Sequence, residues 1–80
     1  MNSYTNKDWH TVKSAAAIRW QHYAANPLLP PEYKAEKVAY WLAVEEGADN
    51  ALHLIQTGHS LEETAQMVVD FLEWKLGGAA

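Results

Sequence analysis

Apolar residues recur at helical spacing in three segments of the chain. In the first segment they stand at offsets of 3, 7, 11 and 14 from the first of them, and so share one helix face: Trp9, Val12, Ala16, Trp20 and Tyr23. The β-branched residues never alternate with period 2 over four or more positions, so no strand is expected. The pattern predicts an all-α fold, a small helical bundle in which residues 1–80 form a single domain.

The first helix is expected to begin near Thr5 or Asn6 and to run to about Ala25. Thr5 and Asp8 have the spacing of a capping box, in which two side chains satisfy free backbone N–H groups at the start of a helix.

Residues 26–31 read Asn-Pro-Leu-Leu-Pro-Pro and end the first helix. Proline lacks a backbone donor and disfavours the α conformation in the residue before it. Leu28 and Leu29 are expected to pack onto the core. Pro31 suits the first position of the next helix, with Glu32 in its first turn.

The next segment, residues 31–57, has two interpretations. As one long helix it carries an unbroken apolar stripe: Tyr33, Tyr40, Val44, Ala48, Ala51 and Ile55. As two helices it breaks at Gly47, and Asp49 caps the second piece. The stripe keeps its phase across Gly47, and an interior glycine costs only about 1 kcal/mol relative to alanine, so the continuous helix is favoured. The bundle then has three helices, or four if the chain breaks.

The last helix, residues 61–76, has a signal at each end. Ser60 can accept from the backbone N–H of Glu63, and the Glu63 side chain can reach back to Ser60. Gly58 is placed to end the preceding helix, and Gly77 to end this one, each in the left-handed conformation.

This last helix has more apolar surface than one core face needs. Its apolar side chains span roughly 220°, whereas a surface helix needs about 100°. The centre of the arc is the expected core face, formed by Leu61, Ala65, Val68, Leu72 and Leu76. Three large residues at its edge are expected to bind a partner, either a second copy or a target: Met67, Phe71 and Trp74.

A chain of 80 residues buries only about 60% of its unfolded surface, so its core is small. The residues expected in that core are Trp9, Trp20, Tyr40, Leu42, Leu52, Ile55, Val68 and Leu72. Because this core cannot cover the apolar arc of the last helix, the bundle is expected to be completed by dimerisation, with twofold symmetry.

The two halves of the chain differ in charge. Residues 1–37 have five Lys or Arg and three Asp or Glu, a net charge of +2, whereas residues 38–80 have one Lys and seven Asp or Glu, a net charge of −6. This favours self-association or a basic surface on a partner protein, met by Glu62, Asp70 and Glu73 of the last helix. The same acidity argues against direct nucleic-acid binding, which needs clustered Lys or Arg.

No arrangement of residues indicates catalysis or a cofactor. The chain has four histidines, none of them paired at the i, i+4 spacing that brings two imidazoles to one metal, so no metal site is expected. The pairs Glu45/Glu46 and Glu62/Glu63 point about 100° apart on a helix, and neither forms an acid–base couple. The chain is therefore not expected to be an enzyme.

Gly58-His59-Ser60-Leu61 resembles the Gly-His-Ser-Leu of peptidyl carrier proteins, whose serine opens a helix and carries phosphopantetheine. The resemblance covers four residues, and only twenty residues follow Ser60. The alternative function is a carrier or small-ligand-binding helical domain, which would use Ser60 or a pocket between helices lined by Trp and Tyr.

The leading hypothesis is a small non-enzymatic regulator or inhibitor that binds a host protein. The chain begins with Met1, has no cysteine, and combines an aromatic surplus with an acidic half, as is typical of small phage or mobile-element proteins. The longest apolar run is far short of the ~20 residues that span a bilayer. A cytoplasmic protein with no membrane contact is expected.

Overall fold

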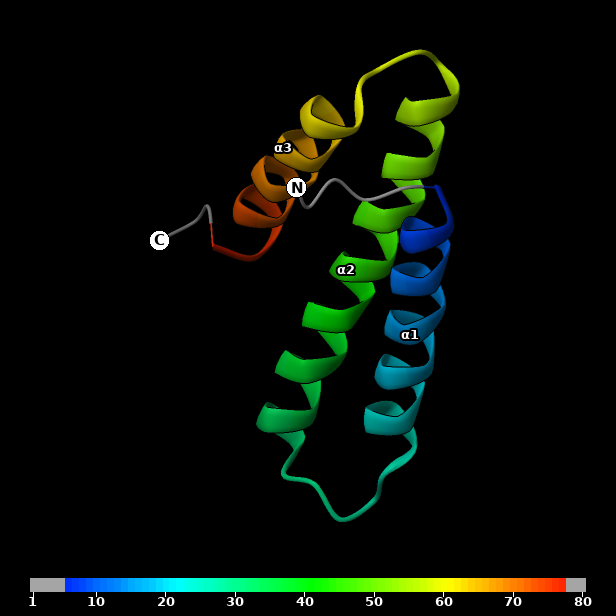
Figure 1. Ribbon diagram of the computed structural model, residues 1–80. Helices are drawn as coiled ribbons and strands as arrows, with labels where there is room; N and C mark the ends of the chain where they lie inside the picture. The colour runs from blue at the N-terminus through cyan, green and yellow to red at the C-terminus, as the bar shows by residue number, and fades with distance from the viewer. Residues whose placement is uncertain (1–5, 78–80) are drawn as a thin grey trace.

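The computed structural model describes residues 6–77, and this part of the chain contains three helices and no strand. Helices α1 (Asn6–Ala25) and α2 (Pro31–Gln56) form a long antiparallel hairpin, and α3 (Leu61–Leu72) packs beside the C-terminal half of α2 (Figure 1). A π-helical turn, η1 (Glu73–Gly77), follows α3. The predicted all-α bundle is confirmed. No helix within these residues is both long and apolar enough to cross a membrane.

The link between α1 and α2 turns outward at Leu28. The side-chain oxygen Oδ1 of Asn26 accepts a hydrogen bond from the Leu28 backbone N–H at 2.9 Å, which closes a local turn. Leu28 is therefore 89% exposed, and the prediction that it packs onto the core is wrong. Leu29 is half-buried against Tyr23 and Tyr33. Pro31 opens α2, as expected.

Helix α2 continues through Gly47 without a break, which confirms the interpretation as one long helix. Gly47 is buried where α3 crosses α2. A Cβ atom at this position would lie 3.3 Å from Val68 Cγ1 and 3.5 Å from Phe71 Cδ2. The glycine therefore permits a close approach of two helices, which offsets its low helix propensity.

The start of α3 matches its sequence signals. Ser60 Oγ accepts a hydrogen bond from the Glu63 backbone N–H at 3.0 Å, and Gly58 has the left-handed φ of 101°. The Glu63 carboxylate does not complete a capping box, because its Oε1 lies 3.2 Å from His59 Nδ1 instead. The cap predicted at Thr5 lies outside the described residues.

The end of the last helix differs from the prediction. The α-helix stops at Leu72 and continues as the π-helical turn η1, and Gly77 does not adopt the left-handed conformation. A π turn bonds each N–H to the carbonyl five residues earlier, so the side chains after Leu72 leave the face that α-helical spacing gives them. Leu76, expected in the core, is exposed.

The centre of the core is made of small side chains. The fully or almost fully buried positions are Ala16, Ala43, Ala48, Ala51 and Thr64. Trp9 and Val68 are also buried, as predicted, while Trp20, Leu52, Ile55 and Leu72 are half-buried around them. Apart from Trp9 and Val68, large apolar side chains therefore lie around this core instead of filling it.

Two residues predicted in the core lie on the surface. Tyr40 is 44% exposed and Leu42 is 41% exposed. Both belong to the N-terminal half of α2, which α3 does not reach because α3 is less than half as long as α2. Periodicity identifies an apolar face, but the length of the covering helix decides how much of that face is buried.

Candidate functional site

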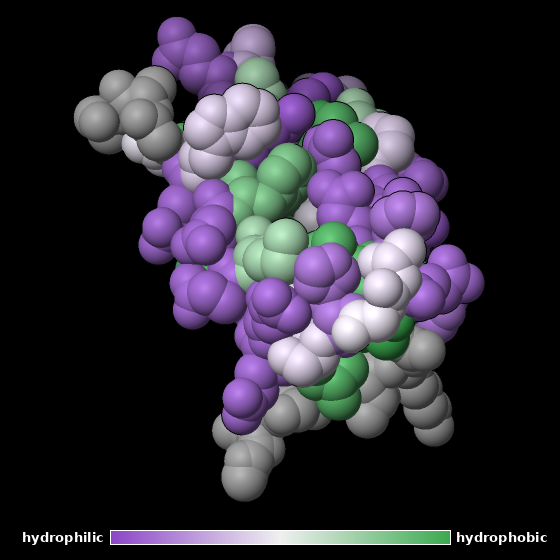
Figure 2. Space-filling model, turned by 90° about the horizontal axis from the view of Figure 1, so that it is seen from above, coloured by the Kyte–Doolittle hydropathy of each residue, from purple (hydrophilic) through white to green (hydrophobic). Residues whose placement is uncertain are grey.

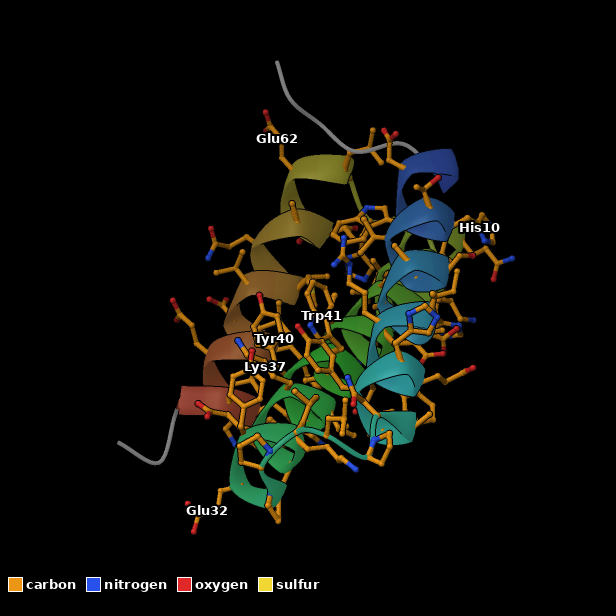
Figure 3. The ribbon with its side chains drawn as sticks, turned by 90° about the horizontal axis from the view of Figure 1, so that it is seen from below. His10, Glu32, Lys37, Tyr40, Trp41 and Glu62 are labelled. Atoms are coloured by element: carbon orange, nitrogen blue, oxygen red, sulfur yellow. The ribbon has the colours of Figure 1, made fainter. Side chains whose placement is uncertain are left out.

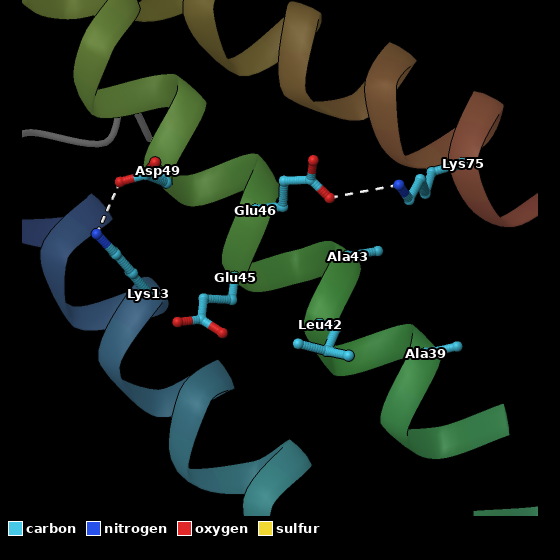
Figure 4. A pocket seen from close by; sticks show the side chains of 8 residues that line it. All are labelled: Lys13, Ala39, Leu42, Ala43, Glu45, Glu46, Asp49 and Lys75. Atoms are coloured by element: carbon cyan, nitrogen blue, oxygen red, sulfur yellow. Dashed lines mark hydrogen bonds and ion pairs between the residues drawn. The ribbon is translucent and has the colours of Figure 1, made fainter. Parts of the chain in front are cut away.

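An open groove of about 580 Å³ runs along α2, between α1 on one side and η1 on the other (Figure 4). Its apolar floor comes from Ala39, Leu42 and Ala43 of α2. The remaining lining residues are all charged: Lys13 of α1, Glu45, Glu46 and Asp49 of α2, and Lys75 of η1.

One ion pair borders each side of this groove. Lys13 Nζ lies 2.7 Å from Asp49 Oδ1, and Lys75 Nζ lies 3.4 Å from Glu46 Oε1 (Figure 4). The hydrogen bond and the charge of Lys13 lower the pKa of Asp49, and Asp49 raises the pKa of Lys13 in return. All four side chains are well exposed, so both pairs can open toward another charged group.

Glu45 contributes a negative charge that forms no ion pair in residues 6–77. Its Oε1 accepts a hydrogen bond from the indole Nε1 of Trp20 at 2.7 Å, in a partly buried position. No Lys or Arg in residues 6–77 forms an ion pair with it. The groove therefore has three carboxylates against two ammonium groups, a net negative lining.

A second hollow, of about 290 Å³, lies farther along α2 and is bordered by Met67, Val68 and Phe71 of α3. Its α2 residues continue those of the groove at spacings of three and four, so both belong to one face of α2. We call this face the α2 stripe: Ala39, Leu42, Ala43, Glu46, Gly47, Asn50, His53 and Leu54. At 1.5 Å per residue the stripe is about 22 Å long, or about four helical turns.

The structure brings together the three large apolar residues predicted to bind a partner. Met67 is exposed, Trp74 is 69% exposed, and Phe71 is half-buried with its ring centroid 6.1 Å from that of Trp74. Lys75 Nζ lies 6.0 Å from the Trp74 ring, a cation–π contact. Met67, Phe71 and Trp74 form the α3 edge. Seen from above, the molecule has a narrow apolar strip between hydrophilic side chains (Figure 2).

The three predicted acidic residues, Glu62, Asp70 and Glu73, are all exposed. Asp70 Oδ1 accepts a hydrogen bond from Gln66 Nε2 at 3.1 Å, and Glu62 points away from the other helices (Figure 3). None of the three lines the groove or the second hollow. They add negative charge to the exposed surface of α3 and η1 without forming a pocket of their own.

A different face of α2 carries exposed tyrosines, which we call the tyrosine face: Tyr33 and Tyr40. The Tyr40 ring packs edge-on against Trp41 with centroids 4.9 Å apart, and Lys37 Nζ lies 5.5 Å from the Tyr33 ring. Figure 3 shows Tyr40 and Trp41 pointing into the space between α3 and α1. Arg19 covers Trp41 with its Cζ 5.0 Å from the ring centroid.

The sequence did not indicate the groove, because its lining comes from three elements far apart in the chain. The available signal was the run of small and apolar residues at helical spacing, Ala39, Leu42 and Ala43, followed one turn later by Glu46.

Within residues 6–77, no group of three or more His, Cys, Asp or Glu side chains is placed to hold a metal ion. Ser60 is exposed, but its hydroxyl serves as the cap of α3. Comparison with protein-family models, curated proteins and solved structures finds no match to this chain. Its function must therefore be inferred from its own surfaces.

Proposed function

We propose that this chain is a small non-enzymatic regulator or inhibitor that works by binding another protein. The observation that carries the proposal is the distribution of side-chain size. Apart from Trp9 and Val68, the buried side chains are those of alanines and Thr64, whereas Tyr33, Tyr40, Leu42, Met67, Val69 and Trp74 are exposed. Large aromatic and Met side chains supply much of the binding energy in protein interfaces, and a free protein rarely exposes so many without a partner.

The target-binding surface in this proposal is the α3 edge. Trp74 protrudes from it, and the second hollow beside Met67 and Phe71 offers a recess for a side chain of the target. Residues 61–77 have four carboxylates and one lysine, a net charge of −3. A basic surface on the target would meet Glu62, Asp70 and Glu73, which would speed association and fix its orientation. The proposed target is a host protein, and the chain a phage or mobile-element product.

Affinity capture with a matched variant tests this proposal. The wild-type chain and a Phe71→Ser/Trp74→Ser double variant serve as bait in a lysate of the native host, and quantitative mass spectrometry compares the captured proteins. We expect one protein to be enriched by the wild type and lost with the double variant, while circular dichroism shows that the helices are retained. Ile18→Ser, at an exposed position on α1, is the control that should keep the target.

Equal capture by the wild type and the double variant would remove the α3 edge from the proposal. Turnover of a substrate by the purified chain would contradict the non-enzymatic assignment.

A further inference from the structure

We infer that the α2 stripe binds an amphipathic helix of about four turns with a basic polar face, contributed by the target protein. This inference rests on the proposed function and specifies the chemistry of the partner. It concerns a surface that adjoins the α3 edge at the second hollow and extends from there along α2 into the groove.

The arrangement of the helices leaves room for such an occupant. In the described part of the chain α1 and α3 each pack along α2, while the backbones of α1 and α3 do not approach each other. The α2 stripe lies on the outward side of α2, away from the space between α1 and α3, and is bordered by Lys13 of α1 on one side and Lys75 of η1 on the other.

The floor of the groove suits close helix packing. Ala39 is exposed and has only a methyl group, and Ala43 beside it is buried, so a second helix can approach to the short end of the usual 8–10 Å range. Leu42 is 41% exposed between them and supplies a side chain that an apolar residue of the partner can contact. The face of the occupant that meets this floor must therefore be apolar.

The charge of the groove determines the other face of the occupant. Glu45 and Asp49 lie one helical turn apart, and Glu45 forms no ion pair in residues 6–77. Lys or Arg side chains at a spacing of four on the occupant would meet both carboxylates. Because the Lys13 and Lys75 pairs are exposed, a competing cation can replace either lysine at low cost.

A second copy of this chain is the less suitable occupant. A twofold dimer brings the same net negative surface of both protomers together, with three carboxylates and two lysines from each groove. Like charges in contact oppose such a dimer. Charge complementarity therefore favours a basic segment of another protein.

Two synthetic 14-residue peptides test the inference. Both place leucine on one helix face; one has lysine at the remaining positions, and the other has glutamate there. The ¹⁵N-labelled full chain is titrated with each peptide and observed by NMR. We expect the lysine peptide to shift the amide signals of Ala39, Leu42, Ala43 and Lys75, and the glutamate peptide to leave them unchanged at the same concentration.

Three variants identify the contacts. Leu42→Ser should weaken binding of the lysine peptide about tenfold, because it removes the exposed apolar contact. Glu45→Gln keeps an acceptor for the Trp20 indole but removes the charge, and should weaken binding about threefold, with a smaller effect at high salt. Glu32→Gln removes the same charge from an exposed position of α2 outside the groove, and should bind like the wild type.

Equal binding of both peptides, or shifts confined to other residues, would overturn the inference. Concentration-dependent shifts of Leu42 and Ala43 in the protein alone would assign the groove to a second copy, and would also overturn it. If target capture depends on Phe71 and Trp74 but not on Leu42 and Glu45, the proposed function stands and this inference fails.

Discussion

Gly47 of α2 lies directly against Val68 of α3, and a Cβ atom added at Gly47 would be 3.3 Å from Val68 Cγ1. This distance is shorter than an ordinary van der Waals contact between carbon atoms. Val68 is buried and β-branched, so its side chain has few other conformations available. The packing of α3 on α2 therefore depends on the missing side chain at position 47.

Substitutions at Gly47 should separate helix propensity from packing. Gly47→Ala should change the free energy of unfolding by less than about 1 kcal/mol, because the gain in helix propensity is offset by a small displacement of Val68. Gly47→Leu should destabilise the protein by about 2 kcal/mol, because its side chain overlaps Val68 and Phe71. Urea unfolding followed by circular dichroism measures both. An unchanged midpoint for Gly47→Leu would contradict the close approach.

The helices could be predicted because their signals are local. The proline-rich connector, Gly58 and Ser60 each act through the conformation of their own or adjacent residues, and the structure has all three as expected. Gly47 was ambiguous at the level of sequence, because the same residue can end a helix or admit a neighbouring one. Only the position of Val68 resolves which role it has.

The core and the groove were harder to predict because they depend on the relative lengths and crossing of the helices. Tyr40 and Leu42 have the correct periodicity for burial, yet α3 ends before it reaches them. The π-helical turn that displaces Leu76 has no signature in the sequence that we could identify. The groove requires Lys13, Leu42 and Lys75 to meet, and no local pattern relates these residues.

Thr64→Val should stabilise the protein by about 1 kcal/mol. Thr64 is fully buried, and its hydroxyl oxygen has no hydrogen-bond partner in the structure, whereas valine fills the same space with a methyl group. Thermal unfolding should show a higher melting temperature. Thr57→Val is the control, because the Thr57 hydroxyl donates to the Leu54 carbonyl at 2.9 Å and its loss should give no gain. A lower melting temperature for Thr64→Val would show that the hydroxyl has a partner.

Ser60→Ala should destabilise the protein by about 1 kcal/mol, because the backbone N–H of Glu63 loses its acceptor. Ser60→Asp retains a capping oxygen and should keep most of the stability. Intact mass spectrometry of the wild type from its native host should give the bare chain mass of 9.0 kDa. A covalent group that is present on the wild type and absent from Ser60→Ala would instead support the carrier alternative.

The Lys13–Asp49 pair should make stability depend on pH at both extremes. The pKa of Asp49 in the folded protein is lowered from 3.8. The ionised Asp49 therefore stabilises the fold above pH 3.8, and this stabilisation is lost as pH falls through the lowered pKa. The pKa of Lys13 in the folded protein is raised from 10.5. The protonated Lys13 therefore stabilises the fold below pH 10.5, and this stabilisation is lost as pH rises through the raised pKa. Between these two pH limits the contribution of the Lys13–Asp49 pair to the free energy of unfolding should be constant.

An NMR titration of the Asp49 carboxyl carbon checks the cause of this shift. Lys13→Gln should return the pKa of Asp49 toward its ordinary value, because the hydrogen bond from Lys13 is the largest cause of the shift. Lys34→Gln removes a cation that has no ion pair within residues 6–77, and should leave the Asp49 titration unchanged. The same Asp49 pKa in the wild type and in Lys13→Gln would refute the assignment.

The chain should form a symmetric dimer through the tyrosine face, which neither α1 nor α3 fully covers. Tyr33 and Tyr40 are seven residues apart on α2, share one helix face and are both exposed. Two antiparallel copies of α2 would pack these rings together, and the charges at this end of the helix, Glu36 and Lys37, are of opposite sign and can pair across the twofold axis. Light scattering at micromolar concentration should therefore give twice the chain mass of 9.0 kDa.

Substitutions on two faces of α2 locate this contact. Tyr33→Ser/Tyr40→Ser should give the monomer mass with the helical circular dichroism retained, because both rings are only partly buried within the protomer. Leu42→Ser, on the α2 stripe, should leave the dimer intact. A wild type that scatters as a 9.0 kDa monomer would end the dimer prediction. Dissociation by Leu42→Ser but not by the tyrosine variant would place the second copy in the groove.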